Sequence, residues 1–207
     1  MATTTNSTGV GTRAEATRRA LLVSARALFG EQGFAATSLE QIVRGAGVTK
    51  GALYHHFRDK DHVFLAVVEA VKEEVANVVG GAFLAASRTM DPLQTLITGC
   101  LAFIDAHADP AVRRISIIDA RAVFDPVVRR ALDARFEVAA VRGALRSSMR
   151  AGAIDRQPLV ALSHVIAGGL FEACAVIAEA SDEEAARAEA RQVVTRLLDG
   201  LQVRDPA

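Results

Sequence analysis

Residues 34–60 read FAATSLEQIVRGAGVTKGALYHHFRDK, and this stretch decides the fold of the N-terminal part of the chain. Thr37 precedes Glu40 by three residues, and Ser38 precedes Gln41 by three. In either pair the hydroxyl residue can be the N-cap, and the later side chain can accept a hydrogen bond from the N-cap backbone N–H. This spacing is that of a capping box, in which two side chains satisfy free backbone N–H groups at a helix start. The sequence therefore predicts that a helix begins here.

Glycines and polar caps divide the same stretch into three helical segments. Gly45 and Gly47 end the first helix after two turns, because glycine is favoured where the chain leaves a helix. Thr49 caps the next helix, which we expect to end near His56, and Asp59 caps a longer one. Two short helices joined by a glycine turn are typical of a helix-turn-helix unit.

Polar and small residues stand in this unit where a phosphate backbone would meet it. The free N–H groups at a helix N-terminus bind phosphate oxygens, and small residues at a helix start let the helix approach the major groove closely. The residues in or near such positions are Thr37, Ser38, Thr49, Lys50, Gly51, Tyr54, His55 and Lys60. The sequence thus predicts that these residues contact double-stranded DNA.

The charge distribution agrees with DNA as a partner, although the net charge of the whole chain is zero. Residues 13–60 hold eight basic and four acidic residues, a net charge of +4, so the remainder carries −4. A basic end on an acidic body suits a protein that presents one end to DNA.

The rest of the chain is predicted to be helical. Asp-Pro pairs at 91–92, 109–110 and 125–126 each join an N-cap to a proline suited to the first helical position. Further helices are expected from 158 to about 180 and from 182 to 200. We predict an all-α fold of about nine helices, with a disordered leader over 1–12, a three-helix helix-turn-helix DNA-binding domain over 13–60 and a C-terminal helical bundle domain over 61–207.

Cysteine use and hydropathy bear on where the protein works. Cys100 and Cys174 lie within apolar helical patterns, which predicts buried reduced thiols. Residues 1–12 lack the basic start and apolar core of a signal peptide. No apolar run is expected to reach the ~18 residues that suggest a membrane span. We therefore expect a soluble cytoplasmic protein without membrane association.

The histidines and cysteines raise two further hypotheses, a metal site and a catalytic site. His55 and His56 point in different directions on a helix, and no Cys or carboxylate completes a metal set with the nearby His62. A catalytic nucleophile needs a base within reach and a third group to orient that base, and no third group accompanies the Cys-His pairs. These pairs are Cys100 with His107 and Cys174 with His164. We predict no metal site, no cofactor and no catalytic residue.

Several residues of the second domain are candidates for binding a small molecule. Glu172 interrupts the apolar run LSHVIAGGLFEACAVIA over 162–178, where it either lines a cavity or pairs across a subunit interface, because a lone buried charge is costly. Gly168 and Gly169 permit close helix approach, which favours an interface through the last two helices. The candidate ligand-binding residues are Phe103, His107, Asp119, Phe124, Phe136, Phe171 and Glu172.

Residues 37–60 resemble the DNA-binding domain of TetR-family transcriptional regulators. They follow the pattern T-S-x-x-x-I-V-x-x-A-G-V-T-K-G-x-L-Y-x-H-F-x-x-K, preceded by a longer helix and followed by about six helices. The resemblance implies a homodimer whose two helix-turn-helix units bind successive major grooves of a palindromic operator. It also implies that the protein is a repressor and that the domain over 61–207 forms the dimer. A small-molecule effector that binds this domain would release the repressor from DNA.

Matching positions assign roles to individual residues. The resemblance places Thr37, Lys50, Gly51, Tyr54, His55 and Lys60 on DNA, with Ser38, Arg44 and Thr49 as further candidates. Gly45 departs from the larger residue usual at the end of the first short helix, and we expect it to loosen that helix. The alternative hypothesis is a helical small-molecule-binding protein that does not use its helix-turn-helix on DNA.

Overall fold

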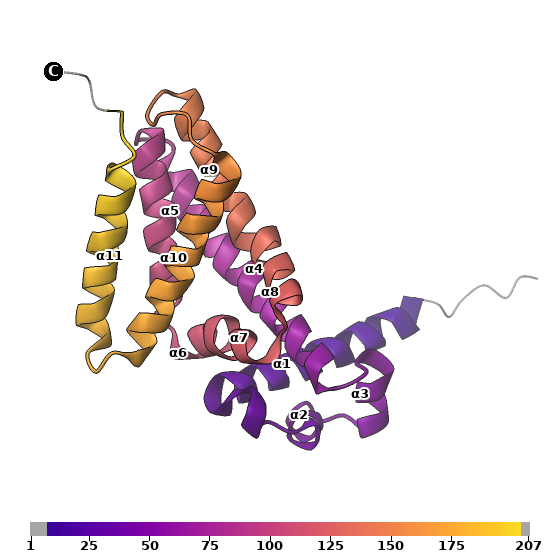
Figure 1. Cartoon of the computed structure of the whole chain (residues 1–207). Coiled ribbons are helices and arrows are strands. Elements are labelled where there is room, and N and C mark those ends of the chain that lie inside the picture. The colour runs from indigo at the N-terminus through magenta and orange to yellow at the C-terminus, as the bar shows by residue number, and fades with distance from the viewer. Residues whose placement is uncertain (1–7, 204–207) are drawn as a thin grey trace, which may run out of the picture. The chain divides into compact units, whose positions relative to one another are not determined.

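The computed structural model describes residues 8–203 of the chain. Within this range the backbone forms nine continuous helices, and the only extended pairing is a single bridge between Ile154 and Gln202 (Figure 1). The predicted all-α fold is confirmed. The first five helices are α1 (Thr8–Ala36), α2 (Leu39–Gly45), α3 (Lys50–His56), α4 (Lys60–Ala86) and α5 (Pro92–Ala106).

Two of the remaining four helices contain a π-helical segment. One consists of α6 (Pro110–Arg113), the π-helix η1 (Arg114–Asp119) and α7 (Ala120–Val123). The next consists of α8 (Pro126–Asp133), the π-helix η2 (Ala134–Val138) and α9 (Ala139–Arg150). The chain then forms α10 (Leu159–Glu179) and α11 (Glu183–Asp199). Single π-helical turns are rare and frequently occur at functional sites.

The three Asp-Pro helix starts form as predicted. The carboxylate of Asp91 accepts from the backbone N–H groups of residues 93 and 94, at 2.9 and 3.0 Å. Asp109 accepts from the N–H of residue 111 at 2.8 Å, and Asp125 from those of residues 127 and 128 at 2.7 and 3.1 Å. Each cap satisfies N–H groups that have no partner inside the helix.

The start of the chain differs from the prediction. The expected leader covers 1–12, of which residues 1–7 lie outside the described residues, whereas residues 8–12 already belong to α1. The predicted end of the first helix at Gly33 agrees with the structure, because this glycine breaks the helical geometry with a φ of 83°. That angle is in the left-handed region that favours glycine.

The residue contacts divide the chain into two compact units, Met1–Ala70 and Val71–Ala207. This division falls ten residues after the boundary expected at 60/61. The reason is that the first turns of α4 complete the core of the first unit. The ring of Phe64 lies 5.0 Å from that of Phe29 and 4.9 Å from that of Phe34, centroid to centroid. Three aromatic rings packed in this way hold α4 against α1.

The second unit is a bundle in which α5 packs against α9, α10 and α11, and α10 packs against α9 and α11 (Figure 1). Its interior is mainly aliphatic and aromatic, with a few buried polar side chains that include Lys72, His107 and Arg113. Both cysteines are free and buried in this core, as predicted, and burial raises the pKa of each thiol to about 12.

Helix α10 corrects the expectation that no apolar segment is long enough to cross a membrane. By length and composition, Leu159–Glu179 passes that test, although only a third of its most apolar window is buried. A core helix of a soluble protein passes the same test, so this is weak evidence for a membrane span. Its buried positions, such as Leu170, Phe171 and Cys174, pack into the bundle.

Candidate functional site

The turn between α2 and α3 is held by backbone geometry and side-chain caps. Ser38 accepts from the backbone N–H of Gln41 at 3.2 Å, and the Gln41 side chain accepts from the N–H of Ser38 at 2.7 Å, so the predicted capping box uses Gln41. Gly47 takes a φ of 65°, and the N–H of Val48 donates to the carbonyl of Val43 at 3.2 Å. This is a Schellman ending, which turns the chain directly into α3.

Helix α3 presents its polar side to solvent. Thr49 caps it by accepting from the N–H of Ala52 at 3.2 Å, and the fully buried Leu53 anchors its inner side. Residues of its outer side are exposed, including Tyr54 at 51%. The other exposed residues are Lys50, Gly51 and His55. A short helix fixed from below, with basic and hydroxyl groups outside, has the form needed to enter a major groove.

The two adjacent histidines of α3 have different environments. His55 is exposed, whereas His56 is half-buried, and its pKa is lowered by burial and by the nearby His55 and Arg18. Within residues 8–203 no group of three or more His, Cys, Asp or Glu side chains has an arrangement that could hold a metal ion.

The glycines Gly45 and Gly51 have opposite reasons to be small. A Cβ at Gly45 would collide with the Oγ of Ser24, which donates to the carbonyl of Ile42 at 2.9 Å, so Gly45 lets α1 and α2 approach. A Cβ at Gly51 would meet nothing closer than the Thr49 hydroxyl, at 3.9 Å. The fold therefore gives no internal reason for glycine at position 51, whereas a surface that must approach α3 closely would.

Lys50 is bound to Glu40 across the two helices. Its Nζ lies 2.5 Å from the Glu40 carboxylate, and both side chains are more than half exposed. The hydrogen bond lowers the pKa of Glu40 and raises the pKa of Lys50, because it favours the charged form of each. To contact a phosphate, the Lys50 ammonium group would have to leave the Glu40 carboxylate or bind both groups at once.

Two of the predicted DNA contacts point into the first unit instead. Thr37 is 2% exposed, and its hydroxyl donates to the carbonyl of Gly33 at 2.8 Å. The Nζ of Lys60 donates to the carbonyls of Phe34 and Thr37, at 2.9 and 3.0 Å, and lies 4.1 Å from the centroid of the Phe34 ring. Both side chains thus hold the segment between α1 and α2 in place.

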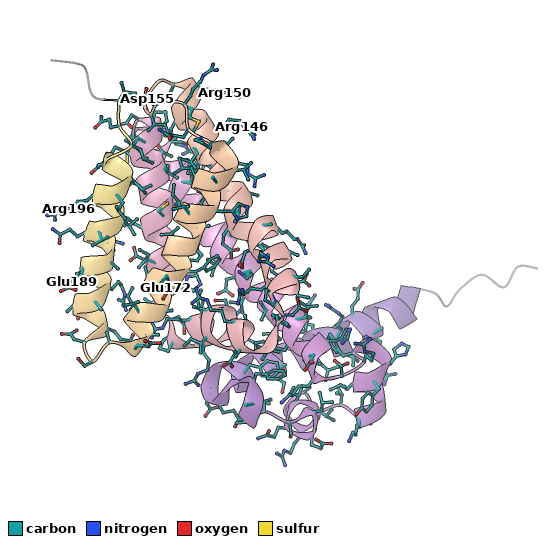
Figure 2. All side chains as sticks on the ribbon, in the orientation of Figure 1. Arg146, Arg150, Asp155, Glu172, Glu189 and Arg196 are labelled. Atoms are coloured by element: carbon teal, nitrogen blue, oxygen red, sulfur yellow. The ribbon has the colours of Figure 1, made fainter. Side chains whose placement is uncertain are left out.

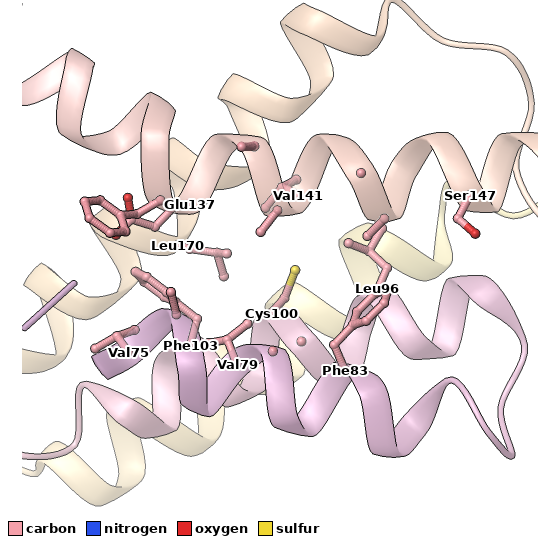
Figure 3. Close-up of a pocket in the computed structure, with 18 residues that line it drawn as sticks. Val75, Val79, Phe83, Leu96, Cys100, Phe103, Glu137, Val141, Ser147 and Leu170 are labelled. Carbon is pink, nitrogen blue, oxygen red and sulfur yellow. The ribbon is translucent and has the colours of Figure 1, made fainter. Parts of the chain in front are cut away.

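The second unit contains a cavity of about 400 Å³ between α4, α5 and the helix formed by η2 and α9 (Figure 3). Among the candidate ligand residues, Phe103 and Phe136 line it. The others lie outside its lining; they are His107, Asp119, Phe124, Phe171 and Glu172. The cavity volume falls in the range of small-molecule sites, which is roughly 300–1,000 Å³.

Two of the residues outside the cavity have clear partners. His107 is 3% exposed, its Nδ1 donates to the carbonyl of Phe103 at 2.8 Å, and its Nε2 lies 3.1 Å from the Ser116 hydroxyl. Glu172 is on the exposed side of α10, with its side chain 66% exposed, and accepts from Arg121 at 3.2 Å (Figure 2). Glu172 therefore does not line this cavity, which leaves the subunit interface as its expected place.

Family models match both units. The model described as "Bacterial regulatory proteins, tetR family" matches residues 21–67, and the "Tetracyclin repressor-like, C-terminal domain" model matches residues 93–201. A solved TetR-family transcriptional regulator from Pectobacterium atrosepticum is 32% identical with a TM-score of 0.78, covering 94% of this chain and 98% of that one. The chain belongs to the TetR family. It is thus a member of a family of DNA-binding transcriptional regulators.

Curated HTH-type regulators match a shorter part of the chain. The HTH-type transcriptional regulator AcrR of Shigella flexneri is 40% identical over 65 residues, which are 31% of this chain and 30% of that relative. The HTH-type transcriptional repressor Rv1474c of Mycobacterium tuberculosis is 38% identical over 63 residues, 30% of this chain and 34% of that protein. The chain thus matches about a third of the length of these curated relatives.

Sequence reasoning missed the charged cluster at one end of the TetR-type C-terminal cavity. Lys72 is 2% exposed and lies 3.0 Å from Asp133 and 2.8 Å from Glu137, residues 61 and 65 positions later in the chain. The available signal was a lysine within the valine-rich stretch of α4, because such a charge needs a buried partner. Nothing in the local pattern identifies Glu137 as that partner.

Proposed function

We propose that this TetR-family protein is a ligand-responsive repressor that binds a palindromic operator as a homodimer and is released by a small molecule. The observation that carries the proposal is the outer side of α3, where Lys50, Gly51 and Tyr54 are exposed above a buried Leu53. The proposed DNA contacts are Ser38, Arg44, Thr49, Lys50, Gly51, Tyr54 and His55, whereas Thr37 and Lys60 position the helices. Operator binding places the protein in the cytoplasm.

DNA binding can be tested without disturbing the fold by substituting Gly51. A Cβ at this position meets nothing closer than the Thr49 hydroxyl at 3.9 Å, and leucine favours the helix over glycine, so we expect Gly51→Leu to keep or raise the stability. Its side chain would obstruct approach of α3 to a groove. We expect at least a tenfold loss of affinity for a duplex selected from a random pool, measured by fluorescence anisotropy.

The electrostatic part of the contact is tested with Lys50→Ala. If Lys50 meets a phosphate, the slope of log affinity against log salt concentration falls by about 0.9, because one fewer counterion is released. If it reads a guanine, the loss is confined to one base position. Unchanged binding by both this variant and Gly51→Leu would favour the alternative, a small-molecule-binding protein that does not use its helix-turn-helix on DNA.

The proposed homodimer rests on the outer side of α10 and α11. This side carries large apolar residues in solvent, including Val165 at 71%, Val176 at 56% and Leu197 at 69% exposure. A Cβ at Gly168 or Gly169 would meet nothing within 4 Å, so neither glycine is needed for packing inside the unit. An apolar helical surface with glycines at its centre suits a second copy of the same surface.

A matched pair of substitutions tests this interface. Val165→Glu places a charge on the proposed surface, and Val127→Glu places one at an equally exposed valine, also 71%, on α8. We expect Val165→Glu to raise the dimer dissociation constant by at least tenfold and Val127→Glu to leave it unchanged, as measured by analytical ultracentrifugation. A monomeric wild-type protein at micromolar concentration would overturn the proposed dimer.

A further inference from the structure

The cavity of the second unit is apolar except for a few side chains. Its walls are formed by residues such as Val75, Val79, Phe83, Leu96 and Leu170 (Figure 3). Glu137, Ser147 and the Cys100 thiol supply its polar side-chain atoms, and the thiol stays neutral at physiological pH because burial raises its pKa to about 12. Glu137 is therefore the only lining residue that can carry a charge.

Glu137 has one oxygen bound and one oxygen free. Its Oε1 accepts from the Nζ of Lys72 at 2.8 Å. Its Oε2 is buried without a hydrogen-bond partner in the described part of the chain, and the side chain as a whole is 10% exposed. Leaving a buried carboxylate oxygen unpaired is costly. A donor supplied by a ligand in the cavity would remove that cost.

The cluster around Glu137 also has one negative charge too many. Lys72 contributes +1, and its two carboxylate partners, Asp133 and Glu137, contribute −2 when both are ionised. Burial raises the pKa of Glu137, because Lys72 only partly offsets the loss of water around the carboxylate. A positive charge next to the free oxygen would neutralise the cluster, whereas a second carboxylate would be repelled.

Aromatic residues near Glu137 favour the same charge. Phe103 and Phe136 line the cavity with Glu137, and phenylalanine ring faces attract cations, as the Arg135 guanidinium 4.8 Å from the centroid of the Phe136 ring already shows. The π-helix η2 contains both Phe136 and Glu137, and so brings two consecutive side chains to the cavity wall. Glu137 and Ser147 lie at opposite ends of the cavity (Figure 3). They are ten residues apart on one helix, which corresponds to about 15 Å along its axis.

We propose that this cavity binds a lipophilic cation, an alkyl or arylalkyl amine, with its ammonium group at the free Oε2 of Glu137 and its apolar body between α4, α5 and α9. The assignment of this ligand as the effector rests on the proposed function. The chemistry of binding rests on the cavity itself.

Three probes of equal chain length test the charge preference directly. Decylamine is protonated at neutral pH, 1-decanol is neutral and decanoate is negative, so they share the apolar contacts and differ at the head group. We expect isothermal titration calorimetry of the full chain, below the aggregation limit of each probe, to show decylamine binding at least about tenfold more tightly than 1-decanol. Decanoate should bind most weakly. Equal affinity for the amine and the alcohol, or tighter binding of decanoate, would overturn the proposal.

Matched variants identify the group responsible. Glu137→Gln keeps the shape of the side chain, removes its charge and should lower the affinity for decylamine about tenfold, with 1-decanol within twofold of wild type. Glu172→Gln makes the same change outside the cavity and should alter neither affinity. Gly143→Leu extends into the cavity from a position where a Cβ meets nothing within 4 Å, and should weaken all three probes. A charge preference that persists in a folded Glu137→Gln variant would overturn the role of Glu137.

The DNA readout is kept separate. Calorimetry is done without DNA, and the anisotropy of a selected duplex is measured with and without decylamine. A tenfold amine preference in a protein that binds no selected duplex would support the cavity chemistry and overturn the proposed function. A protein that binds its duplex without any amine preference would support the proposed function and overturn this inference.

Discussion

Lys50 of α3 is bound by Glu40 of α2, with 2.5 Å between the ammonium nitrogen and the carboxylate oxygen. The lysine that we propose to contact DNA is therefore already paired in the free protein, with a glutamate on the same exposed surface. The pair contributes little to the fold, because exposed ion pairs are well solvated. If α3 binds DNA as proposed, Glu40 would compete with the phosphates for Lys50 and would repel them.

Removing the charge of Glu40 should strengthen DNA binding. We expect Glu40→Gln to raise the affinity for duplex DNA several-fold at low salt, with less gain at high salt because the repulsion is screened. Fluorescence anisotropy across a salt series measures this. Glu73→Gln removes the same charge from an exposed position of α4 in the second unit and should have a smaller effect. Weaker binding by Glu40→Gln would mean that the ion pair positions Lys50 for the groove.

Adding even a methyl group at position 45 should destabilise the protein while Ser24 is present. Gly45→Ala would force the Ser24 hydroxyl away from the Ile42 carbonyl, and we expect a loss of about 1–2 kcal/mol in the free energy of unfolding. Urea denaturation measures it. With Ser24→Ala the collision is removed, so the double variant should recover part of the loss. Independent, additive effects in this cycle would contradict the contact.

Lys60 should contribute to stability more than to DNA binding. In Lys60→Met the side chain keeps its apolar stem but loses the two hydrogen bonds to the carbonyls of Phe34 and Thr37. We expect the free energy of unfolding to fall by about 1–2 kcal/mol. The salt slope of DNA binding should stay within a few tenths of the wild-type value. A slope reduced by about 0.9 would instead return Lys60 to the phosphate contacts.

His107 should make the fold less stable in acid. Burial lowers its pKa from 6.5 to about 4, so the unfolded state binds more protons than the folded state between these values. Stability is therefore lost as pH falls from about 6.5 to about 4, by roughly 3 kcal/mol from this residue. Urea unfolding over this range should show a weaker pH dependence for His107→Gln, whatever its starting stability. The exposed His164→Gln should follow the wild-type curve, and identical slopes for all three would contradict the assignment.

Much of the fold could be predicted because its signals are local. The Ser38–Gln41 capping box and the three Asp-Pro starts each depend on residues two or three positions apart, so they form wherever the chain is helical. The exposed side of α3 follows from the same regularity, with Leu53 inside and Tyr54 outside. The expected starts of α5, α6, α8, α10 and α11 agree with the structure to within about two residues for this reason.

The ligand site could not be predicted in the same way, because its members are brought together over long separations. Phe103 and Phe136 were plausible cavity residues, but the pattern that suggested them equally suggested Phe171, which packs in the core with its ring 5.5 Å from that of Phe103. The π-helical segment around Glu137 has no sequence signature in a stretch of ordinary helix formers. Only the tertiary structure therefore shows that Glu137 lies in the wall of the cavity.

The sequence by itself determined the helices, their caps and the helix-turn-helix with its family, since these depend on neighbours along the chain. Only the tertiary structure decided which polar groups remain available. It turned Thr37 and Lys60 inward, paired Lys50 with Glu40, and bound Lys72 to Glu137 across 65 residues while leaving one carboxylate oxygen free. The physical reason is that a side chain's partner is set by what packs beside it, and packing joins residues that no local pattern connects.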